Sequence, residues 1–119
     1  MIAIVDDDKR ARLSLDCLVR SLGFATCAFA SAEDCLTADL DAFECVISDV
    51  QMPGVSGLQL VHALRGRPRC PPIILITAFP RSDLRKQAVD AGAAFFAEKP
   101  ISPDTLLDML SALSIKKES

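Results

Sequence analysis

The stretch Cys45-Val46-Ile47-Ser48-Asp49, followed by Val50-Gln51-Met52-Pro53-Gly54-Val55-Ser56-Gly57, decides the fold. A short apolar run that ends in an acid predicts a strand buried on both faces, and the turn residues Pro53, Gly54 and Gly57 follow it. Asp49 is therefore expected at the carboxyl end of a buried strand, where ligands bind in open α/β sheets. Taken alone, this aspartate fits an ordinary turn or helix-capping residue equally well.

On both sides of this strand, apolar runs alternate with stretches of helical periodicity. The expected strands cover residues 2–5, 24–29, 45–49, 73–78 and 94–97, and the expected helices cover 11–22, 31–40, 57–65, 82–91 and 103–113. Because the strands are almost wholly apolar, they predict a parallel sheet covered by helices on both faces. Right-handed crossovers then favour the strand order 2-1-3-4-5, with its switch point between strands one and three.

Composition limits the class of protein. A chain of 119 residues, half of them hydrophobic, predicts one domain with a sizeable core. We expect that domain at residues 1–115, with 116–119 as a polar tail or the start of a linker. No apolar run reaches the roughly 18 residues of a membrane span, and no signal peptide precedes the first strand, so we expect a cytoplasmic protein without membrane contact.

Charge and cysteine usage exclude two further classes. The net charge of −3 argues against a nucleic-acid surface within this segment. Five cysteines without a C-x-x-C pair are expected to be reduced core residues rather than a metal or redox site. The basic residues Lys9, Arg10 and Arg12 open the first helix and are expected to form a solvated face.

The predicted strand order brings carboxylates together at the switch point. Asp6 and Asp7 follow the first strand, and Asp49 ends the third. Thr77 lies at the end of the fourth strand, and Lys99 lies just after the fifth. Like charges about 4 Å apart repel by roughly 4 kcal/mol at an effective dielectric constant near 20, so this cluster calls for a cation. Oxygen ligands in a shallow crevice favour Mg²⁺, with Mn²⁺ as an alternative.

The polar residues at the strand ends, taken in order and spacing, resemble the receiver domain of two-component response regulators. The matching set is Asp6-Asp7, Asp49, Met52-Pro53-Gly54, Ser56-Gly57, Thr77-Ala78 and Lys99-Pro100. The resemblance covers the whole chain and implies the flavodoxin-like (βα)5 receiver fold. The run Gly92-Ala93-Ala94-Phe95-Phe96-Ala97-Glu98-Lys99-Pro100 resembles the FixJ type, whose receivers usually precede a transcription domain.

The resemblance implies a role for each matching residue near the cluster. Asp49 would accept a phosphoryl group, because a carboxylate attacks phosphorus and forms a labile acyl phosphate. Asp7 would bind Mg²⁺ directly and Asp6 through water, with Asp49 and the backbone carbonyl of Gln51 completing the protein ligands. Lys99 would add positive charge from the opposite side. The chain would be a switch that catalyses only its own phosphorylation and dephosphorylation.

The family also carries switch residues at two matching positions. Thr77 would donate its hydroxyl to a phosphoryl oxygen and draw the following loop inward. Phe96 would be the aromatic switch, although it fits an ordinary core residue as well, and Phe95 beside it is expected in the core. The Lys99-Pro100 bond would be cis and would orient the lysine.

The resemblance implies partners as well. A sensor histidine kinase would dock over the first helix and the loop at Pro100-Ile101. The signal would leave through the fourth helix, the fifth strand and the fifth helix, a face that can form a phosphorylation-dependent homodimer. DNA would be contacted only through an output domain.

Two other functions stay open at this point. The Asp-x-Asp pattern within Asp6-Asp7-Asp8 is similar to that of haloacid-dehalogenase-like phosphatases, which form an aspartyl phosphate with Mg²⁺; their greater size argues against them. A degenerate receiver that serves only as a binding module is the second alternative. The complete set of acids, with Thr77 and Lys99, argues against it.

Overall fold

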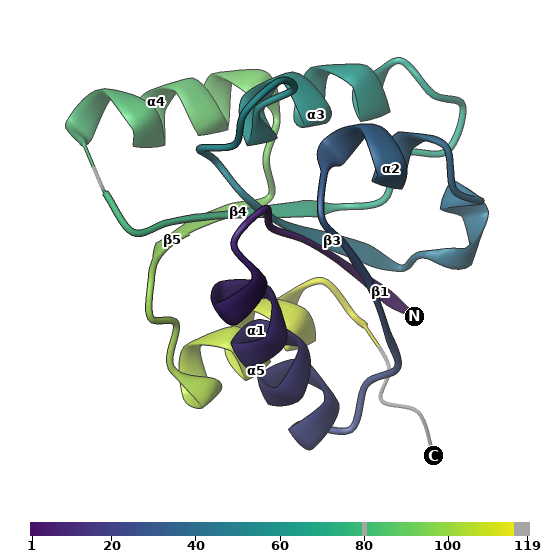
Figure 1. Ribbon diagram of the computed structural model, residues 1–119, viewed down its shortest axis with the longest axis vertical. Helices are drawn as coiled ribbons and strands as arrows, with labels where there is room; N and C mark the ends of the chain where they lie inside the picture. Colours follow the sequence, from purple (N-terminus) through teal and green to yellow (C-terminus); the bar gives the residue numbers. More distant parts are fainter. Residues whose placement is uncertain (80, 116–119) are drawn as a thin grey trace.

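A single parallel sheet forms the centre of the molecule, in the computed structural model that describes residues 1–79 and 81–115 (Figure 1). Its strands are β1 (Ile2–Val5), β2 (Thr26–Phe29), β3 (Cys45–Asp49), β4 (Ile73–Thr77) and β5 (Phe95–Glu98). They lie in the order β2-β1-β3-β4-β5, and all four pairings are parallel. The predicted α/β class and strand order are confirmed.

Helices cover both faces of the sheet, as Figure 1 shows. On one face lie α1 (Lys9–Ser21) and α5 (Pro103–Ala112); on the other lie α2 (Ala32–Leu36), α3 (Gly57–Arg65) and α4 (Ser82–Ala91), and a short 3-10 helix η1 (Leu40–Ala42) precedes β3. Two hydrophobic clusters, one under each helical layer, fill the spaces between helices and sheet. The three inner strands β1, β3 and β4 are buried along their whole length, which explains their uninterrupted apolar sequence.

The helix ends follow from local sequence. Asp8 caps α1 by accepting hydrogen bonds from the backbone N–H groups of Arg10 and Ala11. Ser56 and Gln59 form a reciprocal capping box at the start of α3. At the end of α4, Gly92 adopts φ +103°, a left-handed conformation that favours glycine. These caps fix where α1 and α3 begin and where α4 ends.

Several predicted boundaries were wrong by one or two residues, and the second helix ends at Leu36, four residues earlier than predicted. The second strand begins at Thr26 instead of residue 24, because Phe24 lies buried before pairing starts. The fifth strand covers Phe95–Glu98 rather than 94–97. Leu40, expected in the second helix, belongs to η1 instead. The predicted polar tail at 116–119 lies outside the described residues.

Two of the five cysteines contradict the expectation of a core location. Cys35 and Cys45 are buried and Cys27 is half-buried, but Cys17 and Cys70 are exposed. Burial raises the pKa of Cys35 to about 11 and that of Cys45 to about 12. Neither the helical periodicity around Cys17 nor the proline-rich loop that holds Cys70 indicates whether the side chain is buried.

We expect the rate of thiol alkylation to distinguish the exposed cysteines from the buried ones. The thiolate is the reactive form, so at pH 8 the folded chain should be alkylated by iodoacetamide at Cys17 first, and more slowly at Cys70, whose pKa partial burial raises. Cys35 and Cys45 should react only after unfolding in urea. Peptide mass mapping measures each rate, and native-state alkylation of Cys45 as fast as that of Cys17 would contradict the packing described here.

In the described part of the chain, no helix combines the length and apolarity needed to span a bilayer.

Candidate functional site

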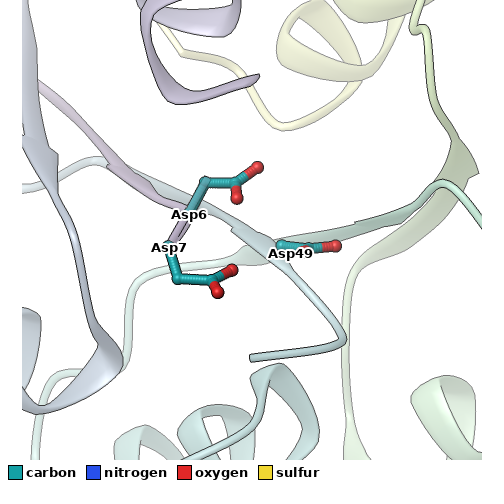
Figure 2. A group of neighbouring side chains, drawn as sticks. All are labelled: Asp6, Asp7 and Asp49. Carbon is teal, nitrogen blue, oxygen red and sulfur yellow. The ribbon is translucent and has the colours of Figure 1, made fainter. Parts of the chain in front are cut away.

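Three carboxylates meet at the carboxyl ends of β1 and β3. Val5 pairs with Ser48 in the register of these strands, so the next residues, Asp6 and Asp49, lie side by side. Asp7 follows in the β1–α1 loop, and one carboxylate oxygen from each of the three acids lies within 4.8 Å of the others. Figure 2 shows the three side chains extending in the same direction from the strand ends.

Lys99 reaches the cluster from the loop after β5. Its Nζ lies 2.6 Å from Oδ2 of Asp6 and 3.6 Å from Oδ1 of Asp49. One ammonium group against three carboxylates leaves the cluster with a net charge of −2. This charge, together with a purely oxygen donor set, fits a divalent hard cation such as Mg²⁺.

Burial differs among the three acids. Asp6 is 1% exposed and Asp49 is 8% exposed, whereas Asp7 is exposed to solvent. Burial raises the pKa of the Asp49 carboxyl, the positive charge of Lys99 opposes this, and the negative charges of Asp6 and Asp7 add to it. Burial and the neighbouring acids thus raise the pKa of Asp49, and the positive charge of Lys99 lowers it.

Both carboxylate oxygens of Asp6 are already engaged. Oδ1 accepts a hydrogen bond of 2.9 Å from the backbone N–H of Asp8, and Oδ2 accepts one of 2.6 Å from Lys99. Among the described residues, no hydrogen bond occupies the carboxylate of Asp7. Asp7 and Asp49 thus have the freer oxygens of the three acids.

The loop after β3 returns close to Asp49. The backbone N–H of Gly57 donates a hydrogen bond of 2.9 Å to the carbonyl of Val50. A Cβ atom added to Gly57 would lie 2.3 Å from the carbonyl oxygen of Asp49, so only glycine fits this close approach. Gln51, whose backbone carbonyl is expected to bind the metal, lies in this loop with its side chain exposed.

The predicted switch residues lie on β4 and β5. Thr77 is fully buried, and its Oγ1 accepts a hydrogen bond of 3.1 Å from the backbone N–H of Phe79. Phe96 is 9% exposed and packs under the α2, α3 and α4 layer, with the guanidinium carbon of Arg85 5.2 Å from its ring centroid. Phe95 is half-buried on the opposite face. The Lys99-Pro100 bond is cis, as expected.

Sequence reasoning missed Arg12. It was assigned to a solvated face, yet it is half-buried and its guanidinium donates a hydrogen bond of 2.8 Å to the main-chain carbonyl of Asp6. Arg12 lies one helical turn after Asp8, so its long side chain can reach back over the β1–α1 loop. That spacing was the one signal in the sequence that could have indicated the contact.

Comparison with known proteins identifies the family. A model of the response regulator receiver domain matches residues 2–111. The chain therefore belongs to the response regulator receiver domain family, and the resemblance noted from its motifs is confirmed.

Similar proteins include transcriptional regulators of the FixJ type. The transcriptional regulatory protein TdiR of Thauera aromatica is 40% identical over 119 residues, which cover 98% of this chain and 52% of that protein. The transcriptional regulatory protein FixJ of Bradyrhizobium diazoefficiens is 36% identical over 116 residues, covering 93% of this chain and 55% of that protein. The chain spans about half the length of the curated relatives it matches.

A solved structure agrees with this assignment. The crystal structure of FixJ-N superimposes with a TM-score of 0.85 at 29% identity, covering 99% of this chain and 95% of that one. The receiver fold and the response regulator class are thus shown for this chain.

Proposed function

We propose that the chain is a phosphorylation-dependent switch that accepts a phosphoryl group on Asp49 from a sensor histidine kinase. The observation that carries the proposal is the placement of the Asp49 carboxylate between two further acids, Asp6 and Asp7, and the ammonium group of Lys99. A single reactive carboxylate in such a mixed-charge cluster suits phosphoryl transfer, where catalysis consists mostly of positioning and charge stabilisation.

The transfer requires only groups present in this site and in the donor. A carboxylate oxygen of Asp49 attacks the phosphorus of the kinase phosphohistidine, the new P–O bond forms, and the P–N bond breaks as the imidazole leaves with a proton from solvent. Lys99, 3.6 Å from Asp49 before the reaction, stabilises the negative charge on the transferred phosphoryl oxygens. Bound Mg²⁺ would neutralise further charge on those oxygens.

The residues that would hold Mg²⁺ are Asp7 and Asp49 directly, Asp6 through water, and the backbone carbonyl of Gln51. The free oxygens of Asp7 support its direct role, and the two hydrogen bonds to the Asp6 carboxylate support an indirect one. Mn²⁺ has the same ligand preference and is the alternative ion.

In this proposal, Thr77 and Phe96 transmit the phosphorylation of Asp49 to the rest of the domain. The hydroxyl of Thr77 already accepts a hydrogen bond from the Phe79 amide, and its own proton is available to donate to a phosphoryl oxygen. Any movement of Thr77 is thereby coupled to the β4–α4 loop. Phe96, packed against Arg85 of α4, links the same event to the face formed by α4, β5 and α5.

The kinase is expected to dock beside α1. A groove of about 370 Å³ runs from α1, at Ala11 and Leu15, to the cis-proline loop at Pro100 and Ile101, and Lys99 forms part of its wall. Because Lys99 borders this groove and also lies 3.6 Å from Asp49, a donor histidine held in the groove would lie near Asp49. Its apolar lining supports contact with an apolar helix face of the kinase.

Signal output is proposed through the α4-β5-α5 face. Val89 on α4 is 64% exposed and lines one surface depression with Phe95 and Phe96 of β5, which supports a contact surface, such as a phosphorylation-dependent homodimer. The relatives are about twice as long as this chain, which supports an output domain that contacts DNA in the full-length protein. We place this switch in the cytoplasm, where histidine kinases phosphorylate their regulators.

The number of phosphoryl groups transferred distinguishes the switch from a phosphatase. With acetyl phosphate and Mg²⁺, we expect incorporation of about one phosphoryl group per chain, followed only by slow release of phosphate, and no incorporation in EDTA. Phosphate release and intact mass are measured on the same samples. Many rapid turnovers that persist in Asp49→Asn would favour the haloacid-dehalogenase-like alternative, and a chain that takes up no phosphoryl group would favour the degenerate binding module.

A further inference from the structure

Arg12 of α1 makes a contact beside the carboxylate cluster that the proposed phosphoryl transfer does not use. Its Nη1 donates a hydrogen bond of 2.8 Å to the main-chain carbonyl oxygen of Asp6. Arg12 is half-buried, whereas Arg10, two residues earlier in the same helix, is exposed. The two arginines carry the same charge, but the side chain of Arg12 is hydrogen-bonded to the Asp6 carbonyl and that of Arg10 is exposed to solvent.

The hydrogen bond from Arg12 completes the set of contacts around Asp6. The backbone N–H of Asp6 donates to the carbonyl of Phe29 at 3.1 Å, and its two carboxylate oxygens accept from Asp8 and Lys99. Since Asp6 is 1% exposed, water has little access to replace a lost donor at its carbonyl. The carbonyl therefore depends on Arg12.

The carbonyl of Asp6 sets the direction in which Asp7 leaves the strand. The C=O of Asp6 and the N–H of Asp7 belong to one planar peptide unit, so fixing the oxygen fixes the whole plane. Asp7 is exposed, and packing does not hold its side chain. The hydrogen bond from Arg12 thus helps to fix the position of the Asp7 Cα, from which the Asp7 carboxylate extends toward Asp49.

We propose that Arg12 is a positioning residue for the divalent metal, acting through the Asp6–Asp7 peptide plane on the Asp7 carboxylate. The inference rests on the proposed function, because it requires that Asp7 bind the metal. Residues that orient metal ligands typically contribute 10- to 100-fold to metal affinity. The sign of the effect is diagnostic: by charge alone, removing an arginine near a cation site should tighten metal binding, whereas loss of positioning should weaken it.

Metal binding to the unphosphorylated chain tests this inference directly. The chain contains neither Trp nor Tyr, so we would follow free Mn²⁺ by electron paramagnetic resonance rather than by intrinsic fluorescence. We expect Arg12→Met to weaken Mn²⁺ binding about 10-fold. The matched control Arg10→Met removes the same charge from the same helix and should leave the affinity unchanged or slightly tighter.

A conservative variant and a thermal scan separate positioning from general stability. Arg12→Lys keeps the charge and a donor but loses the planar guanidinium, and we expect about threefold weaker binding. An affinity of Arg12→Met equal to that of Arg10→Met, or a lowered thermal midpoint with unchanged affinity, would overturn the inference. Should Arg12→Met fail to fold, an unchanged affinity of Arg12→Lys would overturn it. Absence of Mn²⁺ binding in the unsubstituted chain would instead contradict the proposed metal site.

Discussion

Replacement of Lys99 by methionine is expected to slow phosphoryl incorporation from acetyl phosphate about 100-fold or more at saturating Mg²⁺. The ammonium group of Lys99 is the one side-chain cation that contacts the carboxylate cluster within the described residues. Removing one preorganised group that stabilises transition-state charge typically costs a factor of about 10² to 10³ in rate. Time-resolved intact-mass spectrometry measures the rate of incorporation.

The same substitution should also destabilise the metal-free chain. Lys99 is 20% exposed, but its partner Asp6 is 1% exposed and would lose the hydrogen bond to Oδ2. We expect a loss of about 2 kcal/mol in the free energy of unfolding, less than the roughly 3–5 kcal/mol of a fully buried pair, because Lys99 is partly in water. Added Mg²⁺ should restore part of this loss by supplying the missing positive charge.

Lys86→Met is the matched control for Lys99→Met. Lys86 is exposed on α4, and the substitution removes the same charge away from the carboxylate cluster. Its rate of phosphoryl incorporation and its free energy of unfolding should equal those of the unsubstituted chain. A Lys99→Met variant that is phosphorylated as fast as Lys86→Met would contradict the role assigned to Lys99.

Asp49→Asn is expected to abolish phosphoryl incorporation completely. An amide has no anionic oxygen to attack phosphorus, and neither Asp6 nor Asp7 is placed to substitute: both oxygens of Asp6 are engaged, and Asp7 is a proposed metal ligand. The variant should fold at least as stably as the unsubstituted chain in EDTA, because the buried site loses one of three clustered negative charges. Thermal unfolding and intact-mass spectrometry measure both effects.

The matched variant for comparison is Asp7→Asn. If Asp7 serves only the metal, this variant should still be phosphorylated at position 49, but more slowly and at higher Mg²⁺ concentration. Loss of incorporation in Asp7→Asn together with retention in Asp49→Asn would reverse the roles of the two acids.

The convergence of the site was predictable because it depends on topology. Strand ends are marked by a change from apolar to polar residues, and a parallel sheet with order 2-1-3-4-5 has one switch point. Asp6, Asp7 and Asp49 therefore had to meet once the strands were recognised, and the structure brings them within 4.8 Å. Their chemical roles rest on resemblance and stay predictions.

Individual contacts within the site could not be predicted in the same way. Sequence periodicity reports which positions are buried but not which acceptor a long side chain selects. Lys99 was expected to supply positive charge on the side opposite the metal, and the sequence did not indicate that its Nζ would lie closer to Asp6 than to Asp49. Arg12 was assigned to solvent because a basic cluster at a helix start is usually solvated, and the buried carbonyl that it binds carries no signal in the sequence.

Edge positions were the other source of error. Cys17, between Asp16 and Leu18, and Cys70, between Arg69 and Pro71, are exposed, because a single residue in a helix or loop can point outward without breaking the surrounding pattern. The edge strands β2 and β5 pair on one side only, so their ends are less sharply defined by burial than those of the inner strands.

Locating the phosphoryl group on the unsubstituted chain tests most directly whether Asp49 is the phosphoacceptor. After incubation with acetyl phosphate and Mg²⁺, borohydride reduction converts an aspartate that carries the acyl phosphate to homoserine, which peptide mass mapping then places in the sequence. We predict homoserine at position 49 alone, and none when EDTA is present. Homoserine at position 6 or 7, or at no position, would contradict it.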